Sequence, residues 1–201
     1  MEKILLLSDY SLDNKAVADL TRQNHMDYAA RWGLDVLYAV KPYSPHVDWL
    51  FLRDLLKVYP TVITVGTDIL FTDFRRDIRE FFWPRLTVTI QEERTGGGLN
   101  GDFIIWNRTD TAFNELEFCR REAGAYRSTQ DEFNALRHRL RLHAYPCRTI
   151  QSINPAAYSG SEAAWRPGDF AVHCHRPNRA PVVAEKVADI REFLRKYPIN
   201  Q

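Results

Sequence analysis

The feature that most constrains the fold is a run of five β-branched residues, Thr61-Val62-Ile63-Thr64-Val65. Such side chains favour extended structure, and a strand without polar alternation is typical of the buried centre of a parallel sheet. A continuous apolar run at residues 3–8 and an apolar segment at 35–40 are also predicted strands, and apolar residues at helical spacing fill residues 13–32 and 45–59. The order strand, helix, strand, helix, strand predicts a parallel sheet with helices packed on its faces.

The rest of the sequence continues this alternation of extended and helical patterns. Further strands are predicted at residues 87–91, 103–106, 148–150 and 170–174, and further helices at residues 109–123, 128–140 and 181–196. No linker, internal repeat or low-complexity tract divides the chain. We therefore predict one α/β domain over residues 1–201, with a mostly parallel central sheet flanked by helices.

The composition excludes several classes of protein. Of the 201 residues, 45% are hydrophobic, which is enough for a core, and nine Gly and ten Pro are too few for a fibrous chain. The 27 Lys and Arg balance 26 Asp and Glu, so no global field attracts nucleic acid or membranes. Three widely spaced cysteines do not form a disulfide framework or a zinc ribbon. The apolar run at residues 4–7 is too short to span a membrane, and we expect a cytoplasmic protein.

Two polar segments lie where a parallel sheet binds its ligands. Ligands sit beyond the carboxyl ends of the strands, and Ser8-Asp9-Tyr10 and Gly66-Thr67-Asp68 follow the first and third predicted strands. The G-x-G-x-x-G and Walker-type phosphate loops are absent after the first strand. A carboxylate such as Asp68 can hold a divalent metal that neutralises a diphosphate. It could equally cap the turn that follows the strand.

Five segments match, in order, the motifs of one group of enzymes. They are N-H-x-x-Y-A-x-x-W-G-L-D at residues 24–35, V-G-T-D-I-L-F at 65–71, L-N-G-D-F at 99–103, T-Q-D-E-F-N-A-L at 129–136 and W-R-P-G-D-F-A-V-H at 165–173. Together they resemble GT-A glycosyltransferases, in particular the galactosyl/mannosyl and xyloglucan xylosyltransferase family and, more distantly, the glycogenin-like enzymes. The resemblance covers roughly residues 3–175.

The resemblance implies a single GT-A, Rossmann-like domain in which residues 1–90 bind a nucleotide sugar and residues 91–201 bind the acceptor. It implies transfer of a sugar from a nucleotide-diphosphate sugar, expected to be a UDP-sugar, to a hydroxyl group with retention of configuration. A divalent cation, Mn²⁺ or Mg²⁺, would stabilise the departing diphosphate, and Asp68 and His173 match the metal ligands of the family. Without the resemblance, His173 could be a strand histidine bonded to a neighbour, and His175 is a competing ligand.

Other residues match donor-binding positions of these enzymes. Gln130 and Asp131, at a helix N-terminus, are the expected contacts of the donor sugar and the candidate catalytic residues. The remaining candidates are Ser8, Asp9 and Tyr10 for the base and ribose, Asn24 and Arg53 for the phosphate or sugar, Thr67 beside Asp68, and Asn100 and Asp102 for sugar hydroxyls. Each has a structural alternative, which is turn formation, helix capping or a solvated helix face.

Three departures from the family pattern bear on activity. Gly66 stands where the first carboxylate of the D-x-D motif should be, Thr129 replaces an acid, and Asp102 replaces a Gly. The change at Gly66 leaves the identity and affinity of the metal open. With Thr129 it favours the alternative function, a non-catalytic nucleotide-sugar or nucleic-acid binding module of the same fold. A nucleotidyltransferase would need two metal-binding carboxylates, which the sequence does not obviously contain.

The acceptor is expected to be a glycan or a hydroxylated base in DNA. Residues 120–148 carry seven Arg against three acids, so this stretch could contact an anionic acceptor, although a solvated helix explains it as well. The sequence shows no membrane anchor, which suggests a bacterial or phage enzyme.

Overall fold

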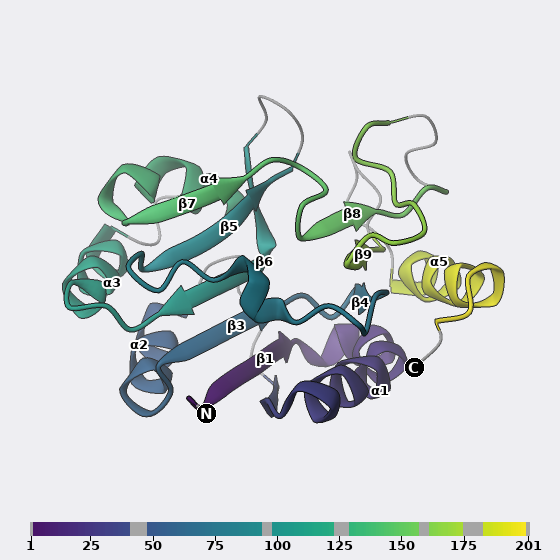
Figure 1. Cartoon of the computed structure of the whole chain (residues 1–201), viewed down its shortest axis with the longest axis horizontal. Helices are drawn as coiled ribbons and strands as arrows, with labels where there is room; N and C mark the ends of the chain where they lie inside the picture. The colour runs from purple at the N-terminus through teal and green to yellow at the C-terminus, as the bar shows by residue number, and fades with distance from the viewer. Residues whose placement is uncertain are drawn as a thin grey trace.

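A computed structural model describes residues 2–40, 48–93, 98–122, 129–156, 161–174 and 183–199, and Figure 1 shows its ribbon. Some predicted features therefore lie outside the described residues. They are the helix starts at Pro45 and Pro181, Ser128, most of the Gly-rich segment at residues 94–98, and His175.

The central sheet has six strands in the order β2-β1-β3-β6-β5-β7. The strand β1 (Ile4–Tyr10) pairs in parallel with β2 (Asp35–Val40) on one side and with β3 (Thr61–Val65) on the other. Nearly every residue of β1 and β3 is buried, because both faces of these strands are covered by other elements. The predicted parallel core is confirmed.

The other half of the central sheet contains a strand that runs in the opposite direction. The strand β6 (Leu99–Asn107) is antiparallel to both β3 and β5 (Val88–Glu92), and β7 (Leu142–Tyr145) joins β5 in parallel at the edge. The sheet is mostly parallel, as predicted. Because β6 is reversed, it begins at the sheet edge where β1 and β3 end.

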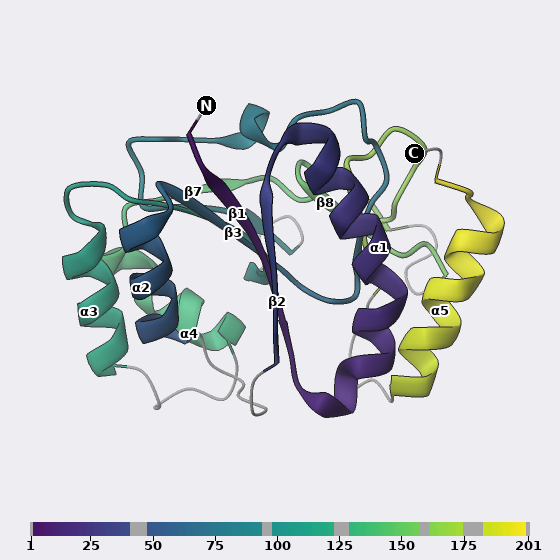
Figure 2. The same ribbon diagram turned by 90° about the horizontal axis from the view of Figure 1, so that it is seen from below.

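Helices cover both faces of the central sheet. On one face, α2 (Trp49–Val58), α3 (Ala112–Glu122) and α4 (Thr129–Leu136) pack together, to the left of β1 and β3 in Figure 2. Their buried side chains meet those of the strands in one apolar cluster that includes Leu5, Leu7, Leu52, Val62, Val88, Leu116 and Phe133. The burial of this apolar stripe, rather than helix propensity, stabilises these short helices.

On the other face lies α1 (Lys15–Trp32), which follows the short helix η1 (Leu12–Asn14). Its Tyr28 ring stacks on Phe71 with the ring centroids 3.9 Å apart. The helix ends at Gly33, whose φ of 66° is left-handed. A glycine adopts this conformation without the steric cost that a Cβ would bring. The predicted helix end at Gly33 is confirmed.

A second, small sheet lies beside the ends of the central strands, on the right in Figure 1. It consists of β4 (Ile69–Phe71), β9 (Ala171–His173) and β8 (Gln151–Ile153) in that order. The last helix, α5 (Val183–Lys196), packs against this sheet and against α1. Their shared apolar cluster includes Val17, Leu70, Val172, Ile190 and Phe193.

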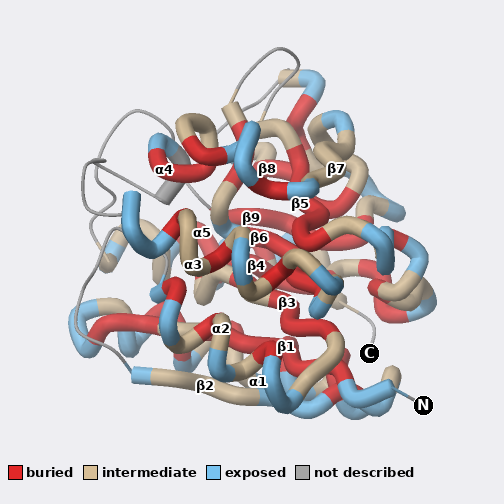
Figure 3. Tube along the Cα trace, turned by 90° about the vertical axis from the view of Figure 1, so that its left-hand side faces the viewer, coloured by how far each residue is buried: buried red, intermediate tan, exposed pale blue. Residues whose placement is uncertain are grey.

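Burial along the chain follows this arrangement. Figure 3 shows the inner strands β1, β3, β5 and β6 largely buried, whereas β2, at the edge of the sheet, is intermediate or exposed. The structure thus agrees with the buried, non-alternating pattern of residues 4–7 and 61–65.

The observed elements differ from the predicted ones at several places. The strand predicted at residues 148–150 lies at β8 instead, because Arg148 adopts a left-handed φ of 67° and ends the extended conformation. The strand predicted at residues 3–8 continues through Asp9 to Tyr10 in β1. The helix predicted at residues 128–140 ends at Leu136 and is followed by the 3-10 turn η3 (Arg137–Arg139). Neither β4, β7 nor the 3-10 helix η2 (Ile78–Phe81) was predicted.

Candidate functional site

The candidate site lies at the carboxyl edge of the central sheet, where β3 ends and β6 begins. Asp68 follows β3 and Asp102 lies near the start of β6. The backbone N–H of Gly66 donates a hydrogen bond of 2.7 Å to the carbonyl oxygen of Asp102. This bond extends the β3–β6 ladder past Val65 and fixes the two acidic residues side by side.

The small sheet brings His173 to the same place from far along the chain. His173 ends β9, which is antiparallel to β4 and pairs His173 with Ile69. Its Nε2 lies 3.3 Å from Oδ1 of Asp68, and both residues are buried. The N–H of Cys174 donates a hydrogen bond of 2.7 Å to the carbonyl oxygen of Asp68. The pair that the resemblance predicted as metal ligands is therefore assembled by strand pairing.

A lysine that the sequence motifs do not assign to this site completes the cluster. Nζ of Lys186, on α5, lies 2.5 Å from Oδ2 of Asp68, and the side chain of Lys186 is 19% exposed. A signal for it exists in the sequence, because Lys186 shares helical spacing with Ile190 and Phe193 on the buried face of α5. A cation on an apolar stripe predicts a buried partner, but the partner cannot be identified without the fold.

The fourth member, Asp102, faces solvent. Its Oδ2 lies 3.7 Å from Nε2 of His173, and its side chain is 53% exposed. Asn100 is buried, and its side-chain oxygen accepts a hydrogen bond of 2.9 Å from the N–H of Asp102. Asn100 thus shapes the turn that presents Asp102, and Asp102 is the exposed acid of the cluster.

The charges of the buried members depend on one another. Burial alone would raise the pKa of the Asp68 carboxyl, but His173 and Lys186 beside it hold that pKa well below its usual range. Burial lowers the pKa of His173 and of Lys186, yet the charge of Asp68 leaves each pKa above its ordinary value. Asp68 is therefore a carboxylate and Lys186 an ammonium at neutral pH.

The side chains around Asp68 leave little room for a divalent cation on its carboxylate. Asp68 has one carboxylate oxygen at the Lys186 ammonium and the other at His173, and Gly66 supplies no carboxylate. In the described ranges, no group of three or more His, Cys, Asp or Glu side chains could hold a metal ion. A divalent cation on Asp68 would also meet the like charge of Lys186. As arranged, these residues do not fit a metal centre, and the metal roles of Asp68 and His173 stay predictions.

The helix α4 borders the site. The N–H of Leu99, the first residue of β6, donates a hydrogen bond of 3.1 Å to the side-chain oxygen of Asn134 on α4. Asp131 is exposed in the first turn of this helix. The side chain of Gln130 lies outside the described residues. The position of α4 is compatible with the predicted donor-sugar contact, which stays a prediction.

The residues predicted to bind the base and ribose lie at the end of β1. Ser8 is buried and Asp9 is half-buried. Tyr10 is buried, and its hydroxyl accepts a hydrogen bond of 3.1 Å from Arg22 while its ring packs edge-on against Tyr38. As arranged here, the Tyr10 ring does not offer an open face for base stacking.

Two further candidates are held away from the cluster by other contacts. The side chain of Asn24 donates to the carbonyl oxygen of Phe71 and accepts from its N–H, at 3.0 and 2.8 Å. Arg53, on α2, forms an ion pair of 3.3 Å with Glu117 on α3. The structure therefore does not bring Asn24 or Arg53 to Asp68.

Thr67 and His25 anchor the segment that carries Asp68. The carbonyl oxygen of Thr67 accepts a hydrogen bond of 2.7 Å from the Thr21 hydroxyl. Nε2 of His25 lies 2.7 Å from the carbonyl oxygen of Ile69. Both bonds tie the residues next to Asp68 to the helix α1, so the carboxylate is held by a fixed backbone.

The W-x-P-G-D segment supports the site from a distance. Asp169 accepts hydrogen bonds from the guanidinium of Arg148, the hydroxyl of Ser152 and the backbone N–H of Arg166. These bonds hold the loop that leads into β9, and hence the position of His173. The motif thus has a structural role that its sequence did not reveal.

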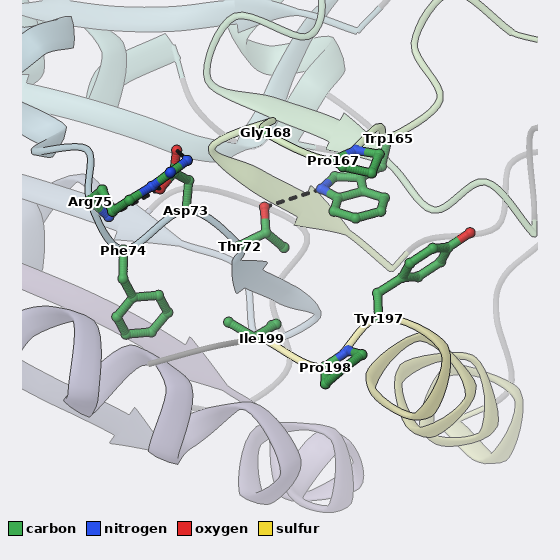
Figure 4. Close-up of a pocket in the computed structure, with 10 residues that line it drawn as sticks. All are labelled: Thr72, Asp73, Phe74, Arg75, Trp165, Pro167, Gly168, Tyr197, Pro198 and Ile199. Carbon is green, nitrogen blue, oxygen red and sulfur yellow. Dashed lines mark hydrogen bonds and ion pairs between the residues drawn. The ribbon is translucent and has the colours of Figure 1, made fainter.

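A cavity of about 360 Å³ lies at the opposite end of the small sheet, beside Thr72 and Gly168. Figure 4 shows Trp165 and Tyr197 on one side of it and Asp73 with Arg75 on the other. Asp68 directly precedes β4 (Ile69–Phe71) and Thr72 directly follows it, so the two residues lie at opposite ends of this strand. The cavity is therefore separate from the acidic cluster.

Comparison with known proteins identifies the fold. No protein-family profile and no curated protein matches this sequence. A glycosyltransferase involved in the glycosylation of the major capsid of PBCV-1 matches with a TM-score of 0.70 and 13% identity, over 94% of this chain and 99% of that chain. The apo form of the glycosyltransferase GlyE of Streptococcus pneumoniae TIGR4 matches with a TM-score of 0.58 and 11% identity, over 96% of this chain and 64% of that chain.

A third solved structure contains ligands. It is a mutant of Drosophila beta1,4galactosyltransferase 7 in complex with manganese, UDP-Gal and xylobiose, with a TM-score of 0.53 and 10% identity over 93% of this chain and 79% of that chain. These matches confirm the GT-A fold that the sequence motifs implied. Among the described helices, none has the length and apolar character needed to cross a membrane.

Proposed function

We propose that this chain, which has the fold of the GT-A-type glycosyltransferases, transfers a sugar from a nucleotide-diphosphate sugar to a hydroxyl group of a glycan. The observation that supports this function is the convergence of Asp68, Asp102, His173 and Lys186. They meet beyond the carboxyl ends of parallel strands, which is where open α/β sheets bind their ligands. We further propose that the nucleotide is a uridine diphosphate.

The charges of the cluster suit such a donor. A diphosphate carries negative charge that must be neutralised as the bond to the sugar breaks. Lys186 provides an ammonium with three N–H donors, and His173 provides an imidazole whose pKa is raised by Asp68 although burial lowers it. The exposed carboxylate of Asp102 can accept hydrogen bonds from sugar hydroxyls. Lys186 and His173 would thus bind the phosphates, and Asp102 would bind the sugar.

The reaction breaks the bond between the anomeric carbon and the phosphate oxygen and forms a bond to the acceptor oxygen. With retention, we propose that the leaving phosphate takes the acceptor proton, so that no side chain is required as the base. Gln130 or Asp131 would contact the donor sugar from the first turn of α4. Asp102 and the turn made by Asn100 would orient the sugar.

The acceptor is proposed to be a sugar hydroxyl. The Drosophila neighbour holds xylobiose beside its nucleotide sugar, and a GT-A fold suits such an acceptor here. A hydroxylated DNA base stays a prediction. Many of the Arg residues of residues 120–148 already have partners, since Arg120 and Arg121 pair with Glu117 and Arg139 lies over the ring of Phe118. These contacts favour the interpretation of this stretch as a solvated helix surface.

Incubation of the protein with a panel of UDP-sugars, with and without Mn²⁺, tests the proposal. Release of UDP, by hydrolysis or by transfer to an added glycan, is expected for at least one donor. The variant Asp102→Asn should lower that release at least tenfold. The control is Asp110→Asn, because Asp110 is an exposed acid beyond the end of β6. A rise in Tm with UDP but no turnover would favour the non-catalytic binding module. Neither turnover nor a rise in Tm would refute both functions.

A further inference from the structure

We infer that Lys186 is the resident cation of this site and that nucleotide-diphosphate binding needs no divalent metal ion. The inference rests on the proposed function and adds to it the group that neutralises the diphosphate. It is carried by the contact between Lys186 and Asp68 and by the glycine at position 66. Both features are read directly from this chain's residues.

The first observation is the place of the ammonium. Nζ of Lys186 lies 2.5 Å from Oδ2 of Asp68, on the carboxylate that the D-x-D pattern assigns to the metal. The side chains are 19% and 6% exposed, so this ion pair is shielded from water. A buried ion pair of this kind keeps its charge because each member stabilises the other. The cation is therefore present before any ligand arrives.

The second observation is that the lysine is held by a fixed element. The helix α5 is anchored through Ile190 and Phe193, which pack against Val172 and Cys174 around the small sheet. Lys186 lies one turn before Ile190 on the same buried face. The ammonium is thus positioned by the packing that also positions β9 and His173.

The third observation concerns the missing carboxylate. A Cβ built on Gly66 would lie 3.1 Å from Oδ1 of Asp68 and 3.4 Å from the Cβ of Asp102. A side chain at this position would therefore point into the acidic cluster, where a second metal-binding carboxylate would be required. The chain has a glycine there, so the site lacks one negative charge that would attract a divalent cation.

Gly66 and Lys186 together determine the charge balance of the cluster. Asp68 and a carboxylate at position 66 would together neutralise a divalent cation, and Asp68 with Lys186 is also formally neutral, while Asp102 is the same in both cases. With Gly at position 66 and Lys186 at Asp68, the balance is therefore kept without a metal. The ammonium has three N–H donors, so it can bond a phosphate oxygen and Asp68 together. His173 lies at the other oxygen of Asp68, so Asp68 would keep a partner when Lys186 engages the phosphate.

Binding of UDP to the full chain tests the inference. The protein is treated with EDTA, and the Kd for UDP is measured by calorimetry before and after addition of Mn²⁺. The two values are expected to agree within about twofold. Lys186→Met should raise the Kd at least tenfold, whereas Lys186→Arg should raise it by less, because it keeps the charge. Lys196→Met, in the exposed last turn of the same helix, is the matched control and should leave the Kd unchanged.

A second pair of variants keeps the test decisive if Lys186→Met fails to fold. The double variant Asp68→Asn with Lys186→Met removes both charges and should fold, but should bind UDP weakly with or without Mn²⁺. Gly66→Asp combined with Lys186→Met restores two carboxylates and should make UDP binding dependent on Mn²⁺.

The outcomes separate the inference from the proposed function. UDP binding that requires Mn²⁺ in the wild-type protein overturns the inference and leaves the proposed function standing. An unchanged Kd in a folded Lys186→Met protein also overturns it. Failure of UDP and of every UDP-sugar to bind, with and without Mn²⁺, overturns both.

Discussion

Nζ of Lys186 lies 2.5 Å from Oδ2 of Asp68, which joins the last helix of the chain to the turn after β3. This contact connects two elements that are far apart in the sequence. It also gives the carboxylate a partner on each side, since His173 lies at the other oxygen. The same buried charges therefore link the small sheet, α5 and the turn after β3.

Replacement of Asp68 by Asn should destabilise the fold. The change leaves the Lys186 ammonium buried without its counter-ion, and breaking a buried pair from one side costs about 3–5 kcal/mol. The free energy of unfolding, from urea denaturation at pH 7, measures the loss. The exposed pair Lys15–Asp19 on α1 is the control, where Asp19→Asn should cost about 1 kcal/mol or less. Similar losses for the two variants would show that the Asp68 pair is not effectively buried.

Replacement of Asn24 by Ala should destabilise the protein without changing nucleotide binding. The Asn24 amide satisfies both backbone polar groups of Phe71, and each buried group left unpaired costs about 1–3 kcal/mol. Asn14→Ala, which removes a partly buried contact to Ser11, is the matched control. Urea denaturation and UDP calorimetry provide the two measurements. Weaker UDP binding with unchanged stability would instead place Asn24 in the donor site.

His25 should make the fold less stable in mild acid. Burial lowers the pKa of His25 to about 4, against the opposing effects of its bond to Ile69 and of Asp68. Nε2 faces the carbonyl oxygen of Ile69 and must carry the proton, so Nδ1 accepts from the hydroxyl of Tyr38 at 2.6 Å. The unfolded chain binds a proton below about pH 6.5 while the folded chain does not until about pH 4. Stability is therefore full above pH 6.5 and falls towards pH 4.

The expected loss from His25 is about 3 kcal/mol, since each unit of pKa difference corresponds to about 1.4 kcal/mol. Urea midpoints at pH 4.5, 5.5 and 7 measure it. The variant His25→Gln lacks the titrating group, so its midpoint should fall less than that of the wild type over this range. Parallel curves for the two proteins would exclude His25 as the source of the acid sensitivity.

Replacement of Asp169 by Ala should disorganise the approach to β9. Asp169 binds Arg148, Ser152 and the N–H of Arg166, and loss of these bonds should lower the free energy of unfolding by about 2–4 kcal/mol. Because the same loop sets the position of His173, binding of UDP should also weaken. Urea denaturation and calorimetry measure the two effects. The control is Glu162→Ala, an exposed acid a few residues before the loop. Unchanged UDP affinity would separate the loop from the site.

The strands at the centre of the sheet could be predicted because their physical signal is local. The β-branched run at Thr61–Val65 and the apolar run at residues 4–7 favour extended structure in any context that buries both faces. Gly33 ends α1 for an equally local reason, its left-handed φ. Strands as short as β4 and β7 show too little alternation or β-branching to be predicted. The strand predicted at residues 148–150 is displaced to β8 by the left-handed φ of Arg148, whose side chain pairs with the distant Asp169.

The candidate site was only partly predictable. Asp68, Asp102 and His173 were found because they lie in motifs that resemble one enzyme family. Asn24 lies in such a motif too, and in the structure its side chain bonds to the backbone of Phe71. A motif identifies which residues recur together, but it does not separate those that face the ligand from those that hold the backbone.

The sequence by itself determined the α/β class, the parallel core and the position of Asp68 after the third strand. The periodicity of a strand or helix and the end of an apolar run are set by residues that are neighbours in the chain. Only the tertiary structure decided what surrounds Asp68. The antiparallel pairing of β4 with β9 brings His173 to one carboxylate oxygen, and the packing of α5 brings Lys186 to the other. The charge of a buried site is set by side chains that meet in space, and no local pattern encodes which of them will meet.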